Sequence, residues 1–335
     1  MLIICLALFI VMLFFAFLPG WIEIKRKKDD KSMHINNNYV KDPEYFAKSF
    51  KKLLLKRVKD LRAIEDGQEL ELSKGEIINC PPQNIEPASG SYKHITLFKQ
   101  AVSIMPHSQF LKEMVCLKQV QVGQGTLLRA GLCKEGCYLA NQVQVIRWLD
   151  AKKIVAGENC DLGISATAKE MLLLGKGCHF TRLYAPIIKV GVDGVETVQA
   201  TDLSFPKPAY NAFWDDSKDI EEGKLYEVNI VKRHGDLVVK PGAIVTGSIK
   251  GYGKITIANQ ATVLGNVFGR KDVIIEAGAR VWGDVFSNGM VEMWPDSSIG
   301  QIGKCKSLVT RDGIKLHQNS RIYGYVSTDG EGIVL

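Results

Sequence analysis

The residue types that most often perform chemistry in proteins are present in this chain but scattered along it. The sequence holds 8 cysteines and 6 histidines, the side chains that serve as nucleophiles, general bases and zinc ligands. Cys133 and Cys137 are separated by three residues, yet no second cysteine pair or histidine stands near them at metal-ligand spacing. No Gly-x-x-x-x-Gly-Lys-Ser/Thr phosphate loop occurs. The sequence therefore predicts no catalytic residue, no cofactor site and no metal site.

A repeat of eighteen residues organises the larger part of the chain. Three consecutive blocks begin at Leu237, Ile255 and Val273, with branched apolar residues at offsets 0, 2, 8 and 12. Every block also has a small residue at offset 6 and a glycine at offset 10: Ala243, Ala261, Ala279, Gly247, Gly265 and Gly283. A short fixed period is typical of a solenoid, because one repeat can bury its apolar face only against its neighbours.

The apolar spacing within each block indicates strands. Residues at offsets 0 and 2 share one face, because side chains alternate along a strand. Each repeat should therefore be two or three short strands joined by tight turns, which predicts an all-β solenoid, a parallel β-helix. Other copies of the repeat begin earlier, near Val102, Val120, Ile154 and Leu172, and the one at Ile154 is shortened. Cys160 and Cys178 stand at offset 6 of these copies, where we expect them to be small core residues.

Two classes of enzyme are also built as β-helices, and the spacing of apolar and acidic residues in this repeat fits neither class. Left-handed acyltransferases need an aliphatic residue at every sixth position, but offset 14 here holds Gly251, Gly269 and Ser287. They also need a catalytic base, and His179, at offset 7, is predicted to point outward. Carbohydrate-active β-helices carry acidic clusters on one face, which these short repeats lack. An acyltransferase-like or carbohydrate-active enzyme is thus the alternative interpretation.

The segment from Gly265 to Val285 resembles the bactofilins, the polymer-forming cytoskeletal proteins of bacteria. It reads Gly-x-Val, a spacer, and then Val-x-Ile-x-x-Gly-Ala-x-Val-x-Gly-x-Val. The match is close over residues 237–285 and looser over 102–190 and after 291. The resemblance implies a right-handed parallel β-helix that assembles end to end into nonpolar filaments without nucleotide. It also implies attachment to a membrane and a role in positioning cell-envelope proteins.

An apolar run from Leu2 to Ile22 precedes the repeats and contains no charged residue. It is long enough to span a bilayer as a helix. Bulky aromatic residues fill its far end and no basic residue precedes it, which favours a retained transmembrane anchor over residues 1–24 rather than a cleaved signal peptide. Four basic residues follow at once: Lys25, Arg26, Lys27 and Lys28. This flank predicts a single-pass protein of the bacterial inner membrane, with its N-terminus outside and its body in the cytoplasm.

The formal net charge of +7 belongs to the segment that follows the anchor. Residues 23–62 contain 13 Lys or Arg and 6 Asp or Glu, so the rest of the chain is balanced and nucleic acid is not an expected partner. Residues 25–94 are predicted to be a basic linker with one amphipathic helix, which begins at Asp42-Pro43-Glu44. This helix could lie on anionic headgroups or pack on the end of the solenoid, and the sequence leaves both readings open.

Two repeat blocks, 95–192 and 226–335, are predicted on either side of a loop excursion or hinge at 193–225. A β-helix leaves an unpaired strand edge at each end, where a second copy of the chain could continue the ladder. Because the basic helix should cover the N-terminal end, we expect the polymerisation interface at the C-terminal end: Ile322, Val326, Ile333, Val334 and Leu335. The sequence thus predicts a membrane-anchored scaffold that self-assembles and positions partner proteins.

Overall fold

The chain divides into two compact units, Met1–Lys41 and Asp42–Leu335. The computed structural model describes residues 2–26, 42–73, 75–82, 89–191, 214–215 and 220–335. In the first unit the helix α1 (Leu2–Arg26) covers the apolar run. Among the described residues, no helix is long and apolar enough to cross a membrane, so the predicted transmembrane span is not confirmed. Lys27 and Lys28 of the basic flank lie outside the described residues.

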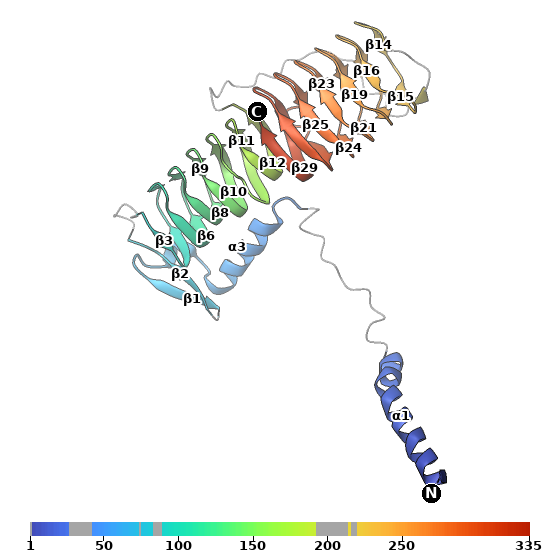
Figure 1. The fold of residues 1–335 in the computed structure, drawn as a ribbon. Coiled ribbons are helices and arrows are strands. Elements are labelled where there is room, and N and C mark those ends of the chain that lie inside the picture. Colours follow the sequence, from blue (N-terminus) through green and yellow to red (C-terminus); the bar gives the residue numbers. More distant parts are fainter. Residues whose placement is uncertain (1, 27–41, 74, 83–88, 192–213, 216–219) are drawn as a thin grey trace. The chain divides into compact units, whose positions relative to one another are not determined.

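The second unit is a β-solenoid of about 12 turns whose strands stack mostly in parallel (Figure 1). The first block contains β1 (Glu69–Ser73), β2 (Glu76–Asn79), β3 (Ser91–Tyr92), β4 (Ile95–Phe98), β5 (Val102–Ile104), β6 (Gln109–Cys116), β7 (Val120–Val122), β8 (Leu127–Cys133), β9 (Gly136–Leu139), β10 (Gln144–Ala156), β11 (Ser165–Leu174) and β12 (His179–Val190). The second block contains β13 (Trp214–Asp215), β14 (Leu225–Tyr226), β15 (Asn229–Lys232), β16 (Leu237–Val239), β17 (Ile244–Val245), β18 (Ile249–Gly251), β19 (Ile255–Ile257), β20 (Thr262–Val263), β21 (Val267–Gly269), β22 (Val273–Ile275), β23 (Arg280–Val281), β24 (Val285–Ser287), β25 (Met290–Met293), β26 (Ser298–Ile299), β27 (Lys306–Thr310), β28 (Gly313–Leu316) and β29 (Arg321–Val334). The predicted parallel β-solenoid is confirmed.

The eighteen-residue period sets the register of the second block. Leu237 of β16 lies opposite Ile255 of β19, which lies opposite Val273 of β22, and Val273 lies opposite Val291 of β25. All four side chains are buried, and so are the alanines at offset 6. The apolar positions of the repeat therefore form one continuous column inside the solenoid, and removing their surface from water is the main favourable contribution to the stability of the stack.

The glycines at offset 10 are required by the close approach of successive turns. A β-carbon placed on Gly265 would collide with the carbonyl group of Gly247, and one on Gly283 would collide with the carbonyl group of Gly265. In each case the obstacle is backbone, which cannot move aside without shifting a whole turn. These glycines therefore keep the stacking distance of the solenoid at this corner.

A column of short polar side chains runs along the same corner, and three of them, Ser248, Asn266 and Asp284, directly follow these glycines in sequence. Asn229 accepts a hydrogen bond from the Ser248 N–H at 2.6 Å, and Ser248 accepts one from the Asn266 N–H at 3.1 Å. Asn266 accepts from the Asp284 N–H at 2.9 Å, and Asp284 accepts from the Ser307 N–H at 2.8 Å. Each side chain thus satisfies a backbone donor of the next turn at a corner where the strand ladder is interrupted.

The two blocks meet at their C-terminal edges. β12 and β29 pair in antiparallel orientation, with Leu183 opposite Val326 (Figure 1). The pairing extends around the turn, since the Val334 N–H donates to the Cys178 carbonyl at 3.0 Å. The two blocks therefore run in opposite directions, and the last strand edge of each block is paired with that of the other.

The residues predicted to form the polymerisation interface lie in this joint. Ile322, Val326 and Val334 are buried, and Ile333 also belongs to the antiparallel ladder, whereas Leu335 is partly exposed. The open edge expected at the C-terminal end is therefore absent from the folded chain, because β12 of the same chain pairs with it. The repeat alone could not reveal this, since it does not specify the direction in which the second block runs.

The basic helix α3 (Tyr45–Arg57) packs on one flank of the first block, and η1 (Leu61–Ala63) follows it. Ala47, Phe50 and Leu54 are buried on its inner side, and the ring of Phe50 lies 5.5 Å from that of Trp148. Of the two readings of this helix, the structure supports packing on the solenoid, but on its flank instead of its end. The inner apolar face of α3 is covered by protein.

Two stretches without a clear repeat in the sequence contribute strands. Within the predicted linker, β2 pairs with β4 and β3 pairs with β6, so these strands extend the first block. Within the predicted excursion, β13 pairs with β15, with Trp214 opposite Asn229. Most of the excursion, including Phe205 and Phe213, lies outside the described residues.

Candidate functional site

Cys133 and Cys137, the most closely spaced cysteines of the sequence, lie in the solenoid interior. Both are buried and free, as is Cys116, which pairs with Cys133 in the ladder of neighbouring strands. Burial raises the pKa of the Cys116 thiol to about 12, which keeps it protonated and unreactive at neutral pH. The described residues contain no group of three or more His, Cys, Asp or Glu side chains that could hold a metal ion.

Cys160 and Cys178 occupy successive turns of the core, as their place in the repeat predicts. Both are fully buried. Their thiols donate to the carbonyls of Ala140 and Gly157, each at 3.1 Å. These two cysteines therefore act as small core residues with satisfied S–H groups, and the prediction made from offset 6 is confirmed.

Two histidines pair with acids on the outside of the solenoid. His179 lies at the joint, where its Nδ1 is 2.5 Å from Glu331 Oε1, and its side chain is 42% exposed, which confirms the predicted outward orientation. His317 Nε2 lies 2.9 Å from Glu292 Oε1 of the preceding turn. Both pairs connect neighbouring strands, so each histidine has a structural role in the sheet.

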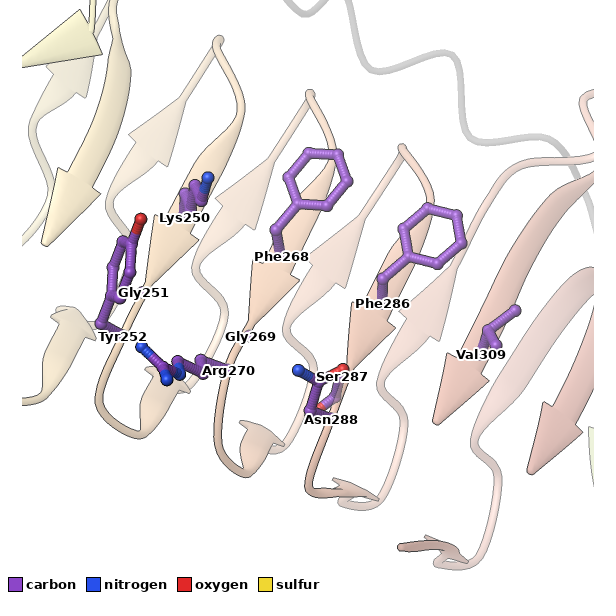
Figure 2. Close-up of a pocket in the computed structure, with 10 residues that line it drawn as sticks. All are labelled: Lys250, Gly251, Tyr252, Phe268, Gly269, Arg270, Phe286, Ser287, Asn288 and Val309. Atoms are coloured by element: carbon purple, nitrogen blue, oxygen red, sulfur yellow. The ribbon is translucent and has the colours of Figure 1, made fainter. Parts of the chain in front are cut away.

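A groove on the second block brings together side chains that the repeat places on the outer surface (Figure 2). Lys250, Phe268, Phe286 and Val309 stand opposite one another on four successive strands, β18, β21, β24 and β27. They point outward because the residues before them, such as Ile249, point into the core. The two phenylalanine rings are nearly parallel, with centroids 5.7 Å apart.

Cationic side chains border this apolar column. Lys250 Nζ lies 5.6 Å from the centre of the Tyr252 ring, and the Arg270 guanidinium lies 5.8 Å from it. Within the described residues, neither Lys250 nor Arg270 forms an ion pair. Together these residues line an open hollow of about 440 Å³, in which Tyr252 and Phe286 are 37% and 38% exposed.

The groove joins an apolar surface to unpaired positive charge, so it can hold a segment that carries both apolar and acidic side chains. No group in it is arranged as a nucleophile with an adjacent base. On the same sheet, the other block already binds a helix in this way, since Phe50 of α3 packs against Trp148. The sequence did signal the groove, because Lys250, Phe268 and Phe286 share offset 13, an outward position where aromatic residues are unexpected.

Comparison with known proteins finds no protein-family model, no curated protein and no solved structure that matches this chain.

Proposed function

We propose that this protein is a membrane-associated scaffold that assembles with copies of itself and positions partner proteins, in the manner of the bactofilins that its repeat resembles. The proposal rests chiefly on one observation, the antiparallel ladder between β12 and β29. In this joint two solenoid edges meet with their backbone groups paired and their cores continuous. Edge-to-edge joining of turns of this sequence type is therefore compatible with a closed core.

A strand edge that could pair with a second copy lies at the start of the second block. Among the described residues, β14 pairs only with β17, and β16 pairs only with β19. Leu225 and Val238, which lie on these two strands, are 49% and 46% exposed. A strand edge with exposed apolar residues favours pairing with another chain, so we place the assembly interface here instead of at the C-terminal strand.

The helix α1 supports membrane attachment. Its described side chains include large apolar ones that are exposed to solvent, among them Phe9, Phe14, Phe17 and Trp21. Burying such a surface in lipid removes it from water, and the basic residue Lys25 near its end would meet anionic headgroups. We propose attachment at the cytoplasmic face of the inner membrane.

The groove of the second block supports the positioning role. We propose that it docks an amphipathic, acidic segment of a partner protein, whose apolar side chains would contact Phe268 and Phe286. Lys250 and Arg270 would then pair with its carboxylates. This charge complementarity gives specificity against basic partners.

Electron microscopy and sedimentation of the full chain in a mild detergent test the assembly proposal. We expect filaments or a concentration-dependent series of oligomers, which the substitution Val238→Lys on the β16 edge should suppress. The matched control Lys250→Glu, on a flank away from that edge, should leave assembly unchanged. A protein that stays monomeric at all concentrations, without filaments, would overturn the proposal.

A further inference from the structure

A second hollow lies between α3 and the flank of the first block, separate from the groove and from the joint. Its volume is about 580 Å³, within the range of about 300–1,000 Å³ that is typical of small-molecule sites. Val115, Leu117 and Leu132 contribute the apolar floor from the solenoid. Leu55 and Leu61 contribute apolar surface from the helical side. The hollow therefore offers an apolar contact surface beside an amphipathic helix.

The rim of this hollow is strongly basic. Six cationic residues line it against three acidic ones, Glu44, Asp60 and Asp150. Lys48 is held by Asp42 at 2.8 Å and Glu44 at 3.1 Å. In the part of the chain that the structure describes, none of the other five forms an ion pair: Lys51, Lys59, Arg62, Lys134 and Lys169. Most of the positive charge at this rim is thus available to a ligand.

The acids at the hollow are already engaged. Asp60 accepts a hydrogen bond from the Arg62 N–H at 3.0 Å. Asp150 is 6% exposed and accepts one from the Thr167 hydroxyl at 2.6 Å. Lys169 and Lys51 lie close enough to offset the charge of Asp150. This leaves Lys59, Arg62 and Lys134 as lining cations that form no ion pair in the described part of the chain and do not act on Asp150.

We propose that this hollow binds an anionic amphiphile, with an acyl chain along the apolar floor and a phosphate or carboxylate head on Lys59, Arg62 and Lys134. Lysine and arginine are the side chains that bind such heads most strongly, and a chain of methylene groups can lie along a floor of valine and leucine side chains. A purely polar anion would leave the apolar floor exposed to water, and a purely apolar ligand would leave the cations without a counter-charge. The proposal does not depend on self-assembly.

The test uses the full chain in phosphatidylcholine nanodiscs with a photoactivatable acyl phosphate as the probe. We expect cross-links that mass spectrometry maps to Leu117 and Leu132, and we expect dodecyl phosphate but not dodecanol to compete with them. The double substitution K59E/R62E should weaken this competition about ten-fold or more, because it replaces two charge-assisted contacts by repulsion. The matched control K52E/K56E makes the same charge change on α3 outside the hollow, and should leave binding unchanged.

The source of the ligand is distinguished by adding phosphatidylglycerol to the nanodiscs. Competition by this lipid identifies a membrane phospholipid, whereas competition by free dodecyl phosphate alone identifies a soluble acyl anion, and either result supports the site. Cross-links that map elsewhere, or that K59E/R62E and K52E/K56E reduce equally, would overturn the proposal. Circular dichroism confirms in each case that the variant is folded.

Discussion

Arg182 of β12 lies opposite Ser327 of β29, and this pairing joins two repeat blocks that run in opposite directions. On its other side, Ser327 lies opposite Val309 of β27 in the parallel ladder. The last strand of the chain therefore belongs to both blocks at once. Because it is paired on both sides, the C-terminal edge adds stability within one chain and offers no ladder to a second copy.

The joint can be tested by cross-linking. The double substitution Arg182→Cys and Ser327→Cys should form a disulfide readily, because directly opposed residues of an antiparallel pair have Cα atoms about 4.5–5.5 Å apart. Arg182→Cys with Val309→Cys, one strand further away, is the matched control and should remain reduced. Peptide mapping under non-reducing conditions measures the disulfide in each variant, in a background with Cys5→Ser and Cys305→Ser. Equal cross-linking in both variants would contradict the antiparallel joint.

The close stacking at the offset-10 glycines predicts that adding one methyl group there lowers the stability of the fold markedly. Gly265→Ala should lower the free energy of unfolding by about 1–3 kcal/mol, since the new β-carbon forces backbone apart at Gly247. Gly90→Ala is the control, because a β-carbon there meets no atom within 4 Å. Chemical denaturation of both variants measures the difference. A loss of stability in Gly90→Ala equal to that in Gly265→Ala would show that alanine itself, and not the collision, is the cause.

The buried carboxyl group of Asp150 predicts a dependence of stability on pH. Burial raises the pKa of Asp150 above its usual value of 3.8, so the folded state resists ionisation of this group. Its contribution to stability is present below pH 3.8 and is lost as the pH rises through the folded-state pKa. Asp150→Asn should therefore be more stable than the wild type at neutral pH, with a difference that shrinks on acidification. Thermal unfolding between pH 3 and 7 checks this, and a difference that is constant over the range would contradict it.

Inward and outward positions of the repeat predict different costs of truncation. Ile249→Ala should cost about 2–5 kcal/mol, because the side chain is fully buried in the continuous core. Phe286→Ala should cost no more than about 1.5 kcal/mol, the value of its stacking on Phe268, because it is 38% exposed. Denaturant unfolding measures both. A larger loss for Phe286→Ala than for Ile249→Ala would show that the groove is part of the core and not a surface for binding.

The features predicted well were those that repeat within eighteen residues. The core positions of Leu237, Ile255 and Val273 follow from alternation along a strand, and the interior place of Cys160 and Cys178 follows from their offset. Strands without this pattern were missed, among them β1 to β3, because a short strand carries little periodic signal when its pairing partner supplies most of its stability.

The chain's sequence by itself determined the parallel solenoid, its period and the inward or outward orientation of each repeated position. These properties depend on residues that are close in sequence, and alternation along a strand is enough to specify them. Only the tertiary structure decided that Val326 lies opposite Leu183 and that α3 covers the flank at Trp148. Both contacts join segments that are far apart in sequence. Because the turns of a repeat resemble one another, several edges and flanks could accept the same partner, and the packing of the whole chain selects one of them.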